Sequence, residues 1–213
     1  MVLKEACIEN TTGIAEVIAA GANRIELCDN LAEGGTSVSY GVAKYVVQFC
    51  SEKRVAVMAM VRPRKGNFIY SPEEIGIMRD DILAYKKLGV SGVVFGCITK
   101  AGKLDKLAIN ELMQATSGID VTFHMAFDEL VEQDKLAAID WLAKIGVRRI
   151  LTHGGQGELS PEETFLTWRE YVDYASDRII ILPGGGIKSH NQEWIIKETR
   201  VSEIHGTNLF GES

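Results

Sequence analysis

The sequence has no basic run, no long apolar run and no Cys-x-x-Cys pair, and each absence excludes a class of protein. Its formal net charge is −6 and its Lys and Arg residues are dispersed, whereas a nucleic-acid surface depends on clustered cations. No apolar stretch approaches the ~18 residues that a membrane span requires. Lys4 and Glu5 interrupt the N-terminal segment, which is not the pattern of a signal peptide. We therefore expect a cytoplasmic protein that binds neither nucleic acid nor membrane.

The four cysteines, Cys7, Cys28, Cys50 and Cys97, are widely spaced along the chain. Without a Cys-x-x-Cys pair, a structural zinc site of the ribbon or finger type is disfavoured. In a reducing cytosol the expected state of all four residues is the free thiol. We assign Cys50 and Cys97 to packing, and the other two cysteines belong to the predicted site.

Eight short apolar runs alternate with helical patterns along the whole chain, which is typical of parallel βα units. With 213 residues, 46% of them hydrophobic, the chain has the size and composition of one globular domain. We therefore predict a single domain over residues 1–213. The bodies of the strands are nearly all apolar. The predicted strands cover residues 3–8, 24–28, 55–61, 92–95, 121–124, 149–152, 178–182 and 202–205.

The sequence marks the starts and ends of several helices. Residues 71–74 and 160–163 both read SPEE, which places Ser at the N-cap, Pro at the first helical position and Glu at the third, as in a capping box. Gly21, Gly89 and Gly146 each end a helical pattern, and a strand follows three residues later. These glycines precede the second, fourth and sixth strands, so the repeating unit is a pair of βα modules.

A repeat of ~60 residues per pair of modules fits a (β/α)8 TIM barrel, which typically has ~200 to 250 residues. An open doubly wound sheet is the alternative, but no Gly-x-Gly-x-x-Gly motif follows the first strand. After the eighth strand, residues 206–213 are too few for a closing helix. Either this C-terminal helix is absent or not included in the sequence, or a partner subunit covers that flank, which leaves a homo-oligomer open.

In a TIM barrel the active site lies at the C-terminal ends of the strands, and this sequence places sulfur there. Cys7 ends the first strand and Cys28 ends the second, and adjacent parallel strands are ~4.8 Å apart, so the two thiols can hold one ion between them. Thiolate and thioether ligands select Cu(I), and Met60 on the third strand can add a sulfur. The alternative is that all three side chains fill the core.

Charged residues at the same strand ends point to acid–base chemistry instead. Glu26, which shares a face with Cys28, and His124 are the candidate acid and base, and Arg62 is a candidate clamp for an anion. Asp128, four residues after His124, is a candidate to orient the imidazole. The alternative is a structural ion pair between Glu26 and Arg62. No Lys lies at the C-terminal end of a strand, which disfavours a Schiff-base mechanism.

Two glycine-rich loops complete the predicted mouth of the barrel. Gly184, Gly185 and Gly186 follow the seventh strand, where barrels often bind phosphate through backbone N–H groups at a short helix. We predict that these glycines and Arg64 bind an anion, and a tight turn that needs positive φ is the alternative. The acidic loop of residues 29–40, after the second strand, is predicted to form a lid or wall over the mouth.

Several stretches together resemble the CutC copper-homeostasis family, and they cover essentially the whole chain. They read ANRIELCDNLAEGGTSVSYG, MVRPRKGNFIYS, GVVFGCITKAGKLD, VTFHMAFD, RILTHGG, LPGGGI and EIHGT. The resemblance implies a TIM barrel and a cytoplasmic protein associated with copper tolerance or trafficking. It also implies Cu(I) ligands at the cysteines that end the first and second strands, which are Cys7 and Cys28 here.

The chain departs from the family pattern at two places. Met125 stands where the family usually has Arg, which removes a cation from the mouth, and residues 37–39 read Ser-Val-Ser after Thr36 where the family usually has Pro-Ser. Two hypotheses follow from the sequence. The first is a Cu(I)-binding protein with thiolate ligands at the barrel mouth. The second is an enzyme acting on a small anionic or phosphorylated metabolite, with acid–base chemistry at Glu26 and His124.

Overall fold

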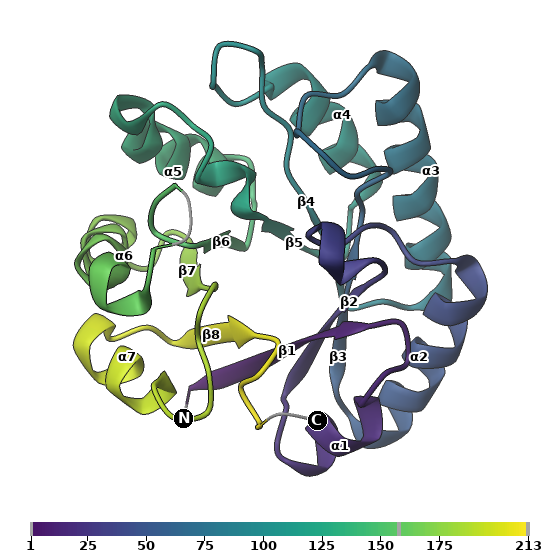
Figure 1. The fold of residues 1–213 in the computed structure, drawn as a ribbon. Coiled ribbons are helices and arrows are strands. Elements are labelled where there is room, and N and C mark those ends of the chain that lie inside the picture. Colours follow the sequence, from purple (N-terminus) through teal and green to yellow (C-terminus); the bar gives the residue numbers. More distant parts are fainter. Residues whose placement is uncertain (1, 157–158, 212–213) are drawn as a thin grey trace.

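Parallel strands form a barrel, and helices wrap around its outside (Figure 1). The computed structural model describes residues 2–156 and 159–211. Hydrogen-bonded neighbours follow the order β7-β6-β5-β4-β3-β2-β1-β8, so the eighth strand joins the first. The predicted (β/α)8 TIM barrel is thereby confirmed. Its strands are β1 (Leu3–Glu9), β2 (Arg24–Cys28), β3 (Ala56–Met60), β4 (Gly92–Phe95), β5 (Asp120–Phe123), β6 (Arg149–Thr152), β7 (Ile180–Pro183) and β8 (Glu203–Gly206).

All eight predicted strands are present, and β2, β4 and β6 have the predicted bounds. The other strands differ from the prediction by one or two residues at an end. The predicted seventh strand, for example, begins two residues early, because the ladder with β6 starts where Ile180 meets Arg149. Hydrogen bonding to a neighbour sets these ends, whereas the apolar pattern continues past them.

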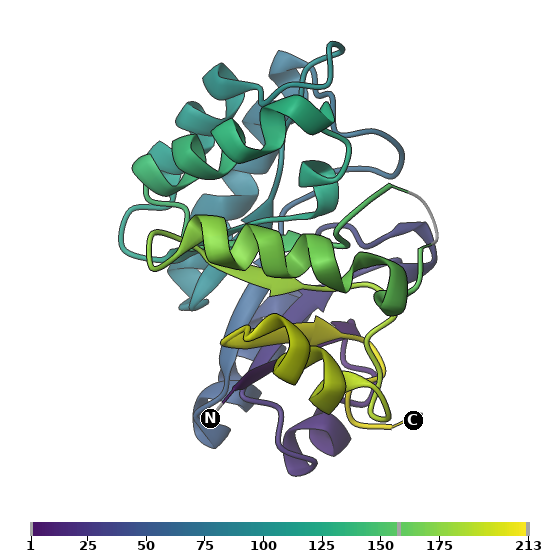
Figure 2. The same cartoon turned by 90° about the vertical axis from the view of Figure 1, so that its left-hand side faces the viewer.

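The helices lie on the outer face of the barrel, and the side view shows them lying against the strands (Figure 2). In the part of the chain that the structure describes, three short 3-10 helices interrupt the loops: η1 (Leu31–Glu33), η2 (Met125–Phe127) and η3 (Glu132–Asp134). Within the described residues, the α-helices are α1 (Ile14–Ala19), α2 (Tyr40–Lys53), α3 (Pro72–Leu88), α4 (Lys106–Ala115), α5 (Lys135–Lys144), α6 (Pro161–Ala175) and α7 (Gln192–Thr199).

The predicted helix signals are confirmed. At the start of α3, the Glu74 carboxylate accepts a hydrogen bond of 2.8 Å from the backbone N–H of Ser71, and the Ser71 hydroxyl accepts one of 3.3 Å from the backbone N–H of Glu74. A second capping box begins α6. Gly21, Gly89 and Gly146 have φ values of 105°, 89° and 88°, which a residue with a side chain adopts at a cost.

The two strands that meet last, β7 and β8, share no ladder in the described part of the chain. An isolated bridge between Lys188 and Asn208 joins the segments that follow them. After β8 the chain continues to Gly211 without a further helix, in agreement with the prediction that the closing helix is absent or not included. Among the residues described, no helix is both long enough and apolar enough to cross a membrane.

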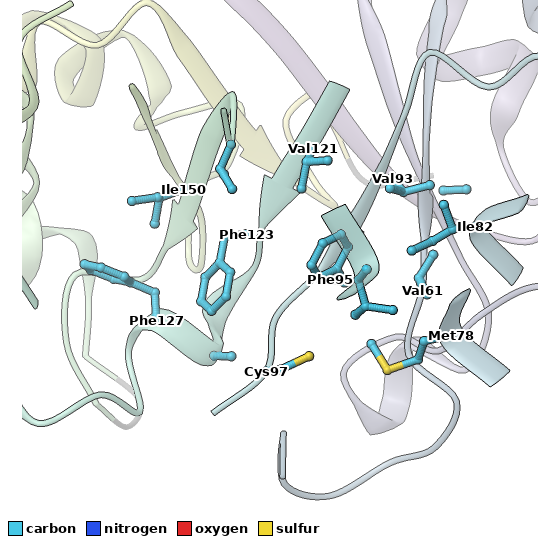
Figure 3. Packing of buried hydrophobic residues seen from close by; sticks show 14 of the residues in the cluster. Val61, Met78, Ile82, Val93, Phe95, Cys97, Val121, Phe123, Phe127 and Ile150 are labelled. Carbon is cyan, nitrogen blue, oxygen red and sulfur yellow. The ribbon is translucent and has the colours of Figure 1, made fainter. Parts of the chain in front are cut away.

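The main hydrophobic core lies between the strands and the helices around them (Figure 3). Val93 and Phe95 of β4 and Phe123 of β5 pack in it. Cys50 and Cys97 are buried in the same cluster, so the prediction that they serve packing is confirmed. Because successive side chains of a strand alternate between two faces, the residues between these apolar ones face the inside of the barrel.

The inside of the barrel contains a buried network of charges, which we call the inner ion network: Glu5, Arg24, Arg149 and Glu203. Arg24 pairs with both Glu5 and Glu203, and Arg149 pairs with Glu203 at 3.0 Å. Arg149 also pairs with Asp120 at 3.0 Å. The expectation that strand bodies are nearly all apolar is wrong here, because these strand residues compensate one another's charge across the barrel.

Candidate functional site

Strand pairing places three ionisable side chains together towards the C-terminal end of the barrel. Cys7 on β1 is opposite Glu26 on β2, and β8 brings His205 beside β1. The Cys7 sulfur, a Glu26 carboxylate oxygen and a His205 ring nitrogen lie within 4.8 Å of one another. All three residues are buried. Such a group can hold a metal ion or exchange protons.

His205, at the end of the eighth strand, is the residue of this group to which sequence reasoning assigns no catalytic or metal-binding role. The signal for it lies in the alternation, because Glu203 and His205 share one face of β8, as Glu5 and Cys7 share one face of β1. The pairing of β1 with β8 then places Glu5 opposite His205. That pairing depends on closure of the barrel, which no local stretch of sequence reveals.

A cavity of about 180 Å³ lies at this end of the barrel. It brings together six predicted catalytic or metal-binding residues, whereas a larger hollow of about 390 Å³ beside Arg148 and Arg200 contains none of them. The cavity is lined by Cys7, Glu26, Cys28, Leu31, Gly34, Met60, Arg62, Phe68, His124, Met125, Leu151, His205 and Thr207. Asp128, Arg64 and the three glycines after β7 are outside this set.

Sulfur-bearing side chains form one wall of the cavity. The Sγ atoms of Cys7 and Cys28 are 4.0 Å apart, and the Cys28 thiol is 3.6 Å from Glu26 Oε2. Met58 and Met60 pack in one cluster with the two cysteines. The predicted sulfur ligands Cys7, Cys28 and Met60 are therefore adjacent, and all three are buried. Soft metal ions prefer such a set of donors.

The two thiols of this wall differ in the direction in which their pKa is shifted. The hydrogen bond from the Cys28 thiol lowers the pKa of Cys7 to about 5 against the effect of burial, and His205 acts in the same direction. The same contact, together with burial, raises the pKa of Cys28 well above its ordinary value. The two shifts are opposite in direction, and they favour a thiolate at Cys7 and a protonated thiol at Cys28. A thiolate is both the form that binds metal and the form that reacts as a nucleophile.

His205 is the cation that faces this thiolate. Its Nδ1 atom is 2.8 Å from a Glu5 oxygen and its Nε2 atom is 3.7 Å from Glu26 Oε2. Burial on its own lowers the pKa of the imidazole, but Glu26, Cys7 and Glu5 together raise it well above 6.5. These contacts therefore favour the imidazolium form of His205 next to the Cys7 sulfur.

Glu26 and Arg62 do not form the structural ion pair that was the alternative to a catalytic role. Burial raises the pKa of Glu26 well above its ordinary value, and its Oε1 atom has no hydrogen-bond partner. The Arg62 guanidinium instead donates to the backbone carbonyls of Glu33, Gly35 and Gly66 at 2.9, 2.8 and 2.8 Å. That alternative is wrong because the loops after β2 and β3 supply these acceptors.

The loop of residues 29–40 forms a wall of the cavity, as predicted. Leu31 of η1 and Gly34 line it. Arg62 fastens the loop through the two carbonyl contacts at Glu33 and Gly35. Gly35 has φ 83° and lies close to Cys28, where an added Cβ would be 3.2 Å from the sulfur. The glycines of this loop let its backbone approach the thiol closely.

His124 is a buried neutral imidazole. Burial and the nearby Arg62 charge lower its pKa to about 3. Its Nδ1 atom accepts a hydrogen bond of 3.1 Å from the backbone N–H of Ala126, at the start of η2. Since Nδ1 is an acceptor, the proton of the neutral ring lies on Nε2, which has no hydrogen-bond partner in the described structure. His124 is thus a hydrogen-bond donor at neutral pH rather than an acid.

Asp128 does not orient His124, so that prediction is wrong. Its carboxylate accepts hydrogen bonds from the Thr152 hydroxyl at 2.6 Å and from the backbone N–H groups of His153 and Gly154 at 2.9 and 3.2 Å. The 3-10 turn η2 separates it from His124 and directs it to the end of β6. Asp128 therefore fixes the loop after β6.

Comparison with known proteins agrees with this architecture. The model of the CutC family matches residues 2–210. The chain belongs to the CutC family. A CutC family protein of Enterococcus faecalis is 48% identical over 207 residues, which are 97% of this chain and 99% of that protein. A human relative, named copper homeostasis protein cutC homolog, is 37% identical over 203 residues, which are 95% of this chain and 72% of that protein.

Solved structures show the same fold. The crystal structure of the CutC protein from Streptococcus agalactiae matches with a TM-score of 0.96 and 42% identity, over 98% of this chain and all of that chain. Phosphoribosyl anthranilate isomerase from Thermotoga maritima matches with a TM-score of 0.62 and 16% identity, over 97% of this chain and 87% of that chain. The second likeness shows the TIM-barrel fold alone.

In this CutC chain, the residues predicted to bind phosphate have other contacts. Arg64 pairs with Glu74 and so attaches its loop to α3. Gly185 and Gly186 have φ values of 87° and 70°, as the tight-turn alternative requires. Gly184 packs against Leu151, Met125 and His205. The anion-binding role of these residues stays a prediction, and their geometry is explained by the turn.

Proposed function

We propose that this CutC protein binds Cu(I) in copper homeostasis, with Cys7 and Cys28 as its thiolate ligands. The observation that carries the proposal is the 4.0 Å separation of their sulfur atoms inside a buried cavity. Thiolates select Cu(I) over harder ions, and free thiols persist in the reducing cytoplasm where we place the protein. The name of the human relative supports a link to copper.

The distance between the sulfurs also bears on the coordination number. With metal–thiolate bonds of about 2.3 Å, a 4.0 Å separation gives a sulfur–metal–sulfur angle of about 120°. That angle suits three ligands in a plane better than two in a line. Met60 packs beside both sulfurs and can supply the third donor, as the sequence suggests. His205 offers a nitrogen within 4.8 Å of Cys7 as a further candidate.

Titration of the reduced, metal-free protein with Cu(I) against a competing chelator tests this proposal. We expect one tightly bound ion, and we expect the Cys7→Ser, Cys28→Ser double variant to bind at least about 100-fold more weakly. Cys50→Ser and Cys97→Ser are matched controls, because these thiols lie in the outer core away from the cavity, and they should bind as the wild type does. Equal affinity in the double variant and the wild type would contradict the proposal.

Coordination by Cys28 requires the loss of its proton, since the pKa of this thiol is raised. Cu(I) binding should therefore release protons and become tighter as the pH rises. Met60→Leu keeps the volume of the side chain and removes the thioether, so a weaker affinity in this variant identifies Met60 as the third ligand. Unchanged affinity assigns the third position to another donor, with the two cysteines retained.

An enzyme acting on a small anionic metabolite is the second candidate function. The observation that favours it is the thiolate of Cys7 beside the imidazolium of His205 and the carboxyl group of Glu26. Glu26 and His205 can exchange protons, and this pair replaces the pair of Glu26 and His124 that the sequence suggests. His124, with a pKa of about 3, serves better as a neutral donor to a substrate oxygen.

A further inference from the structure

The cavity gathers buried polar atoms that have no partner in the protein. Among the described residues, Glu26 Oε1, Arg62 Nε and His124 Nε2 are buried without a hydrogen bond, and all three residues line the cavity. Each side chain is more than nine-tenths buried. Folded proteins satisfy the large majority of their buried polar groups because an unmade hydrogen bond is costly. Three such atoms around one cavity indicate a ligand that bonds to them.

Two of the three atoms are hydrogen-bond donors. Arg62 Nε carries a proton at every accessible pH. His124 Nε2 carries the proton of the neutral ring, because Nδ1 accepts from Ala126. Both side chains line the cavity and pack against the Phe68 ring, with the Arg62 guanidinium 5.0 Å and the His124 ring centre 4.6 Å from the ring centre of Phe68. A ligand that satisfies both must present oxygen acceptors.

The charge of Arg62 indicates the sign of the charge on the ligand. Its other two nitrogens donate to neutral backbone carbonyls, and within the described residues it is part of no ion pair. By contrast, Arg24 and Arg149 in the same barrel each face carboxylates. A buried guanidinium without a carboxylate binds an anion favourably, and a carboxylate matches its geometry.

The size and walls of the cavity limit the ligand further. Its volume of about 180 Å³ is below the range of about 300–1,000 Å³ that is usual for drug-sized ligands. A cavity of about 150 Å³ holds a molecule the size of benzene. Leu31, Met60, Phe68 and Leu151 provide apolar surface around the donors. Nucleotides and sugar phosphates are therefore too large, and the ligand has few carbon atoms.

We propose that the cavity binds a small organic carboxylate whose oxygens accept hydrogen bonds from Arg62 Nε–H and His124 Nε2–H. The carboxylate occupies the side formed by the residues after β3 and β5, and the sulfur wall is formed by side chains of β1, β2 and β3. The inference does not depend on the proposal for copper, because neither donor is one of the copper ligands. It adds an organic ligand class to a site whose sulfurs indicate a metal.

Thermal-shift measurements on the full chain, followed by calorimetry, test this inference. Acetate, glycolate, glyoxylate and pyruvate are the probes, and acetamide and acetone are uncharged controls of similar size. We expect at least one carboxylate to bind saturably and to raise the melting temperature, while the uncharged controls do neither. If none of the four carboxylates binds the wild-type protein at tens of millimolar, the inference is wrong.

A matched pair of variants assigns the binding to the cavity. His124→Asn keeps an acceptor for the Ala126 N–H but is too short to place an N–H at the Nε2 position. His124→Gln keeps an N–H near that position. We expect the asparagine variant to bind the carboxylate about tenfold more weakly or worse, and the glutamine variant to retain more of the affinity. Equal binding by His124→Asn and wild type would overturn the inference.

The same variants separate this inference from the proposal for copper. His124→Asn should leave the affinity for Cu(I) unchanged, because the sulfur ligands lie on other strands. Conversely, the Cys7→Ser, Cys28→Ser double variant should still bind the carboxylate. If copper binds and no carboxylate does, only the inference fails. If a carboxylate binds and copper does not, only the copper proposal fails.

Discussion

Two buried polar regions lie inside one barrel, and they differ in how well their groups are satisfied. In the inner ion network, Arg24 faces Glu5 and Glu203, and Arg149 faces Glu203 and Asp120. In the cavity, towards the C-terminal ends of the strands, a carboxyl oxygen, a guanidinium nitrogen and an imidazole nitrogen have no partner in the described protein.

The difference separates a structural role from a functional one. Both regions are almost fully removed from water, so burial alone does not distinguish them. A buried charge that is paired and hydrogen-bonded makes all its polar interactions within the protein, and removal of one partner is strongly destabilising. A buried group without a partner in the protein makes its hydrogen bond to a molecule that binds from outside. Variants in the two regions should therefore affect different properties.

The largest expected effect belongs to Arg24→Met, which removes the central cation of the inner ion network. Among the described residues, Glu5 then keeps only His205, and Glu203 only Arg149, as a cationic partner, and the free energy of unfolding should fall by about 3–5 kcal/mol. Urea unfolding at pH 7 measures this change. Arg64→Met is the matched control, because its pair with Glu74 is partly exposed and should contribute less than about 1 kcal/mol. A similar fall in the free energy of unfolding in both variants would show that the buried network contributes no more to stability than an exposed ion pair.

The next effect concerns two buried glutamates of opposite behaviour. Burial raises the pKa of Glu5, but the Arg24 charge and the His205 contact outweigh it and lower the pKa from 4.5 to about 2. Its ionised form therefore stabilises the fold above pH 4.5, and that stabilisation is lost as the pH falls towards 2. The pKa of Glu26 is raised instead. Its protonated form therefore stabilises the fold at low pH, and that stabilisation is lost as the pH rises above the ordinary pKa of a glutamate.

Replacement of each glutamate by glutamine should reveal this contrast. At pH 7 we expect Glu5→Gln to lower the free energy of unfolding by about 3 kcal/mol, and the loss should shrink to less than half at pH 3. Glu26→Gln should raise the free energy of unfolding at pH 7. Denaturant unfolding across this pH range provides the measurement, and destabilisation of the same sign and size by both variants would show that the two regions are alike.

The smallest expected effect on stability belongs to His124→Asn. Since Nε2 makes no hydrogen bond and asparagine still accepts from Ala126, the loss is limited to the packing of the ring against Phe68, and the free energy of unfolding should fall by about 1–2 kcal/mol. Urea unfolding of the ligand-free protein checks this value. A loss as large as that of Arg24→Met would mean that His124 serves the fold rather than a ligand.

The sequence predicts the barrel well because the barrel depends on local patterns. Apolar runs of strand length, two capping boxes and glycines with positive φ each act within a few residues, and all are found in the structure. The inner ion network is less accessible from the sequence. Glu5 and Glu203 are 198 positions apart, and only the closure of β1 on β8 brings them to the same arginine.

The site shows the same limit. Cys7, Cys28 and Met60 lie on consecutive strands, so alternation and strand spacing suffice to place them together. His205 joins them from the last strand and is found only through closure. Asp128 illustrates the opposite error, because proximity in sequence to His124 suggests a contact that the turn of η2 prevents. Residue spacing predicts neither the direction of a short turn such as η2 nor which residues the pairing of β1 with β8 brings together.

His205 belongs to both regions, since its Nδ1 atom faces Glu5 and its Nε2 atom faces Glu26. Because the two nitrogens share one ring, a charge that arrives on one side changes the proton affinity on the other. The cavity and the inner ion network are therefore coupled electrostatically through the His205 ring. A charge that binds beside Nε2 in the cavity changes the strength of the contact between Nδ1 and Glu5 in the inner ion network.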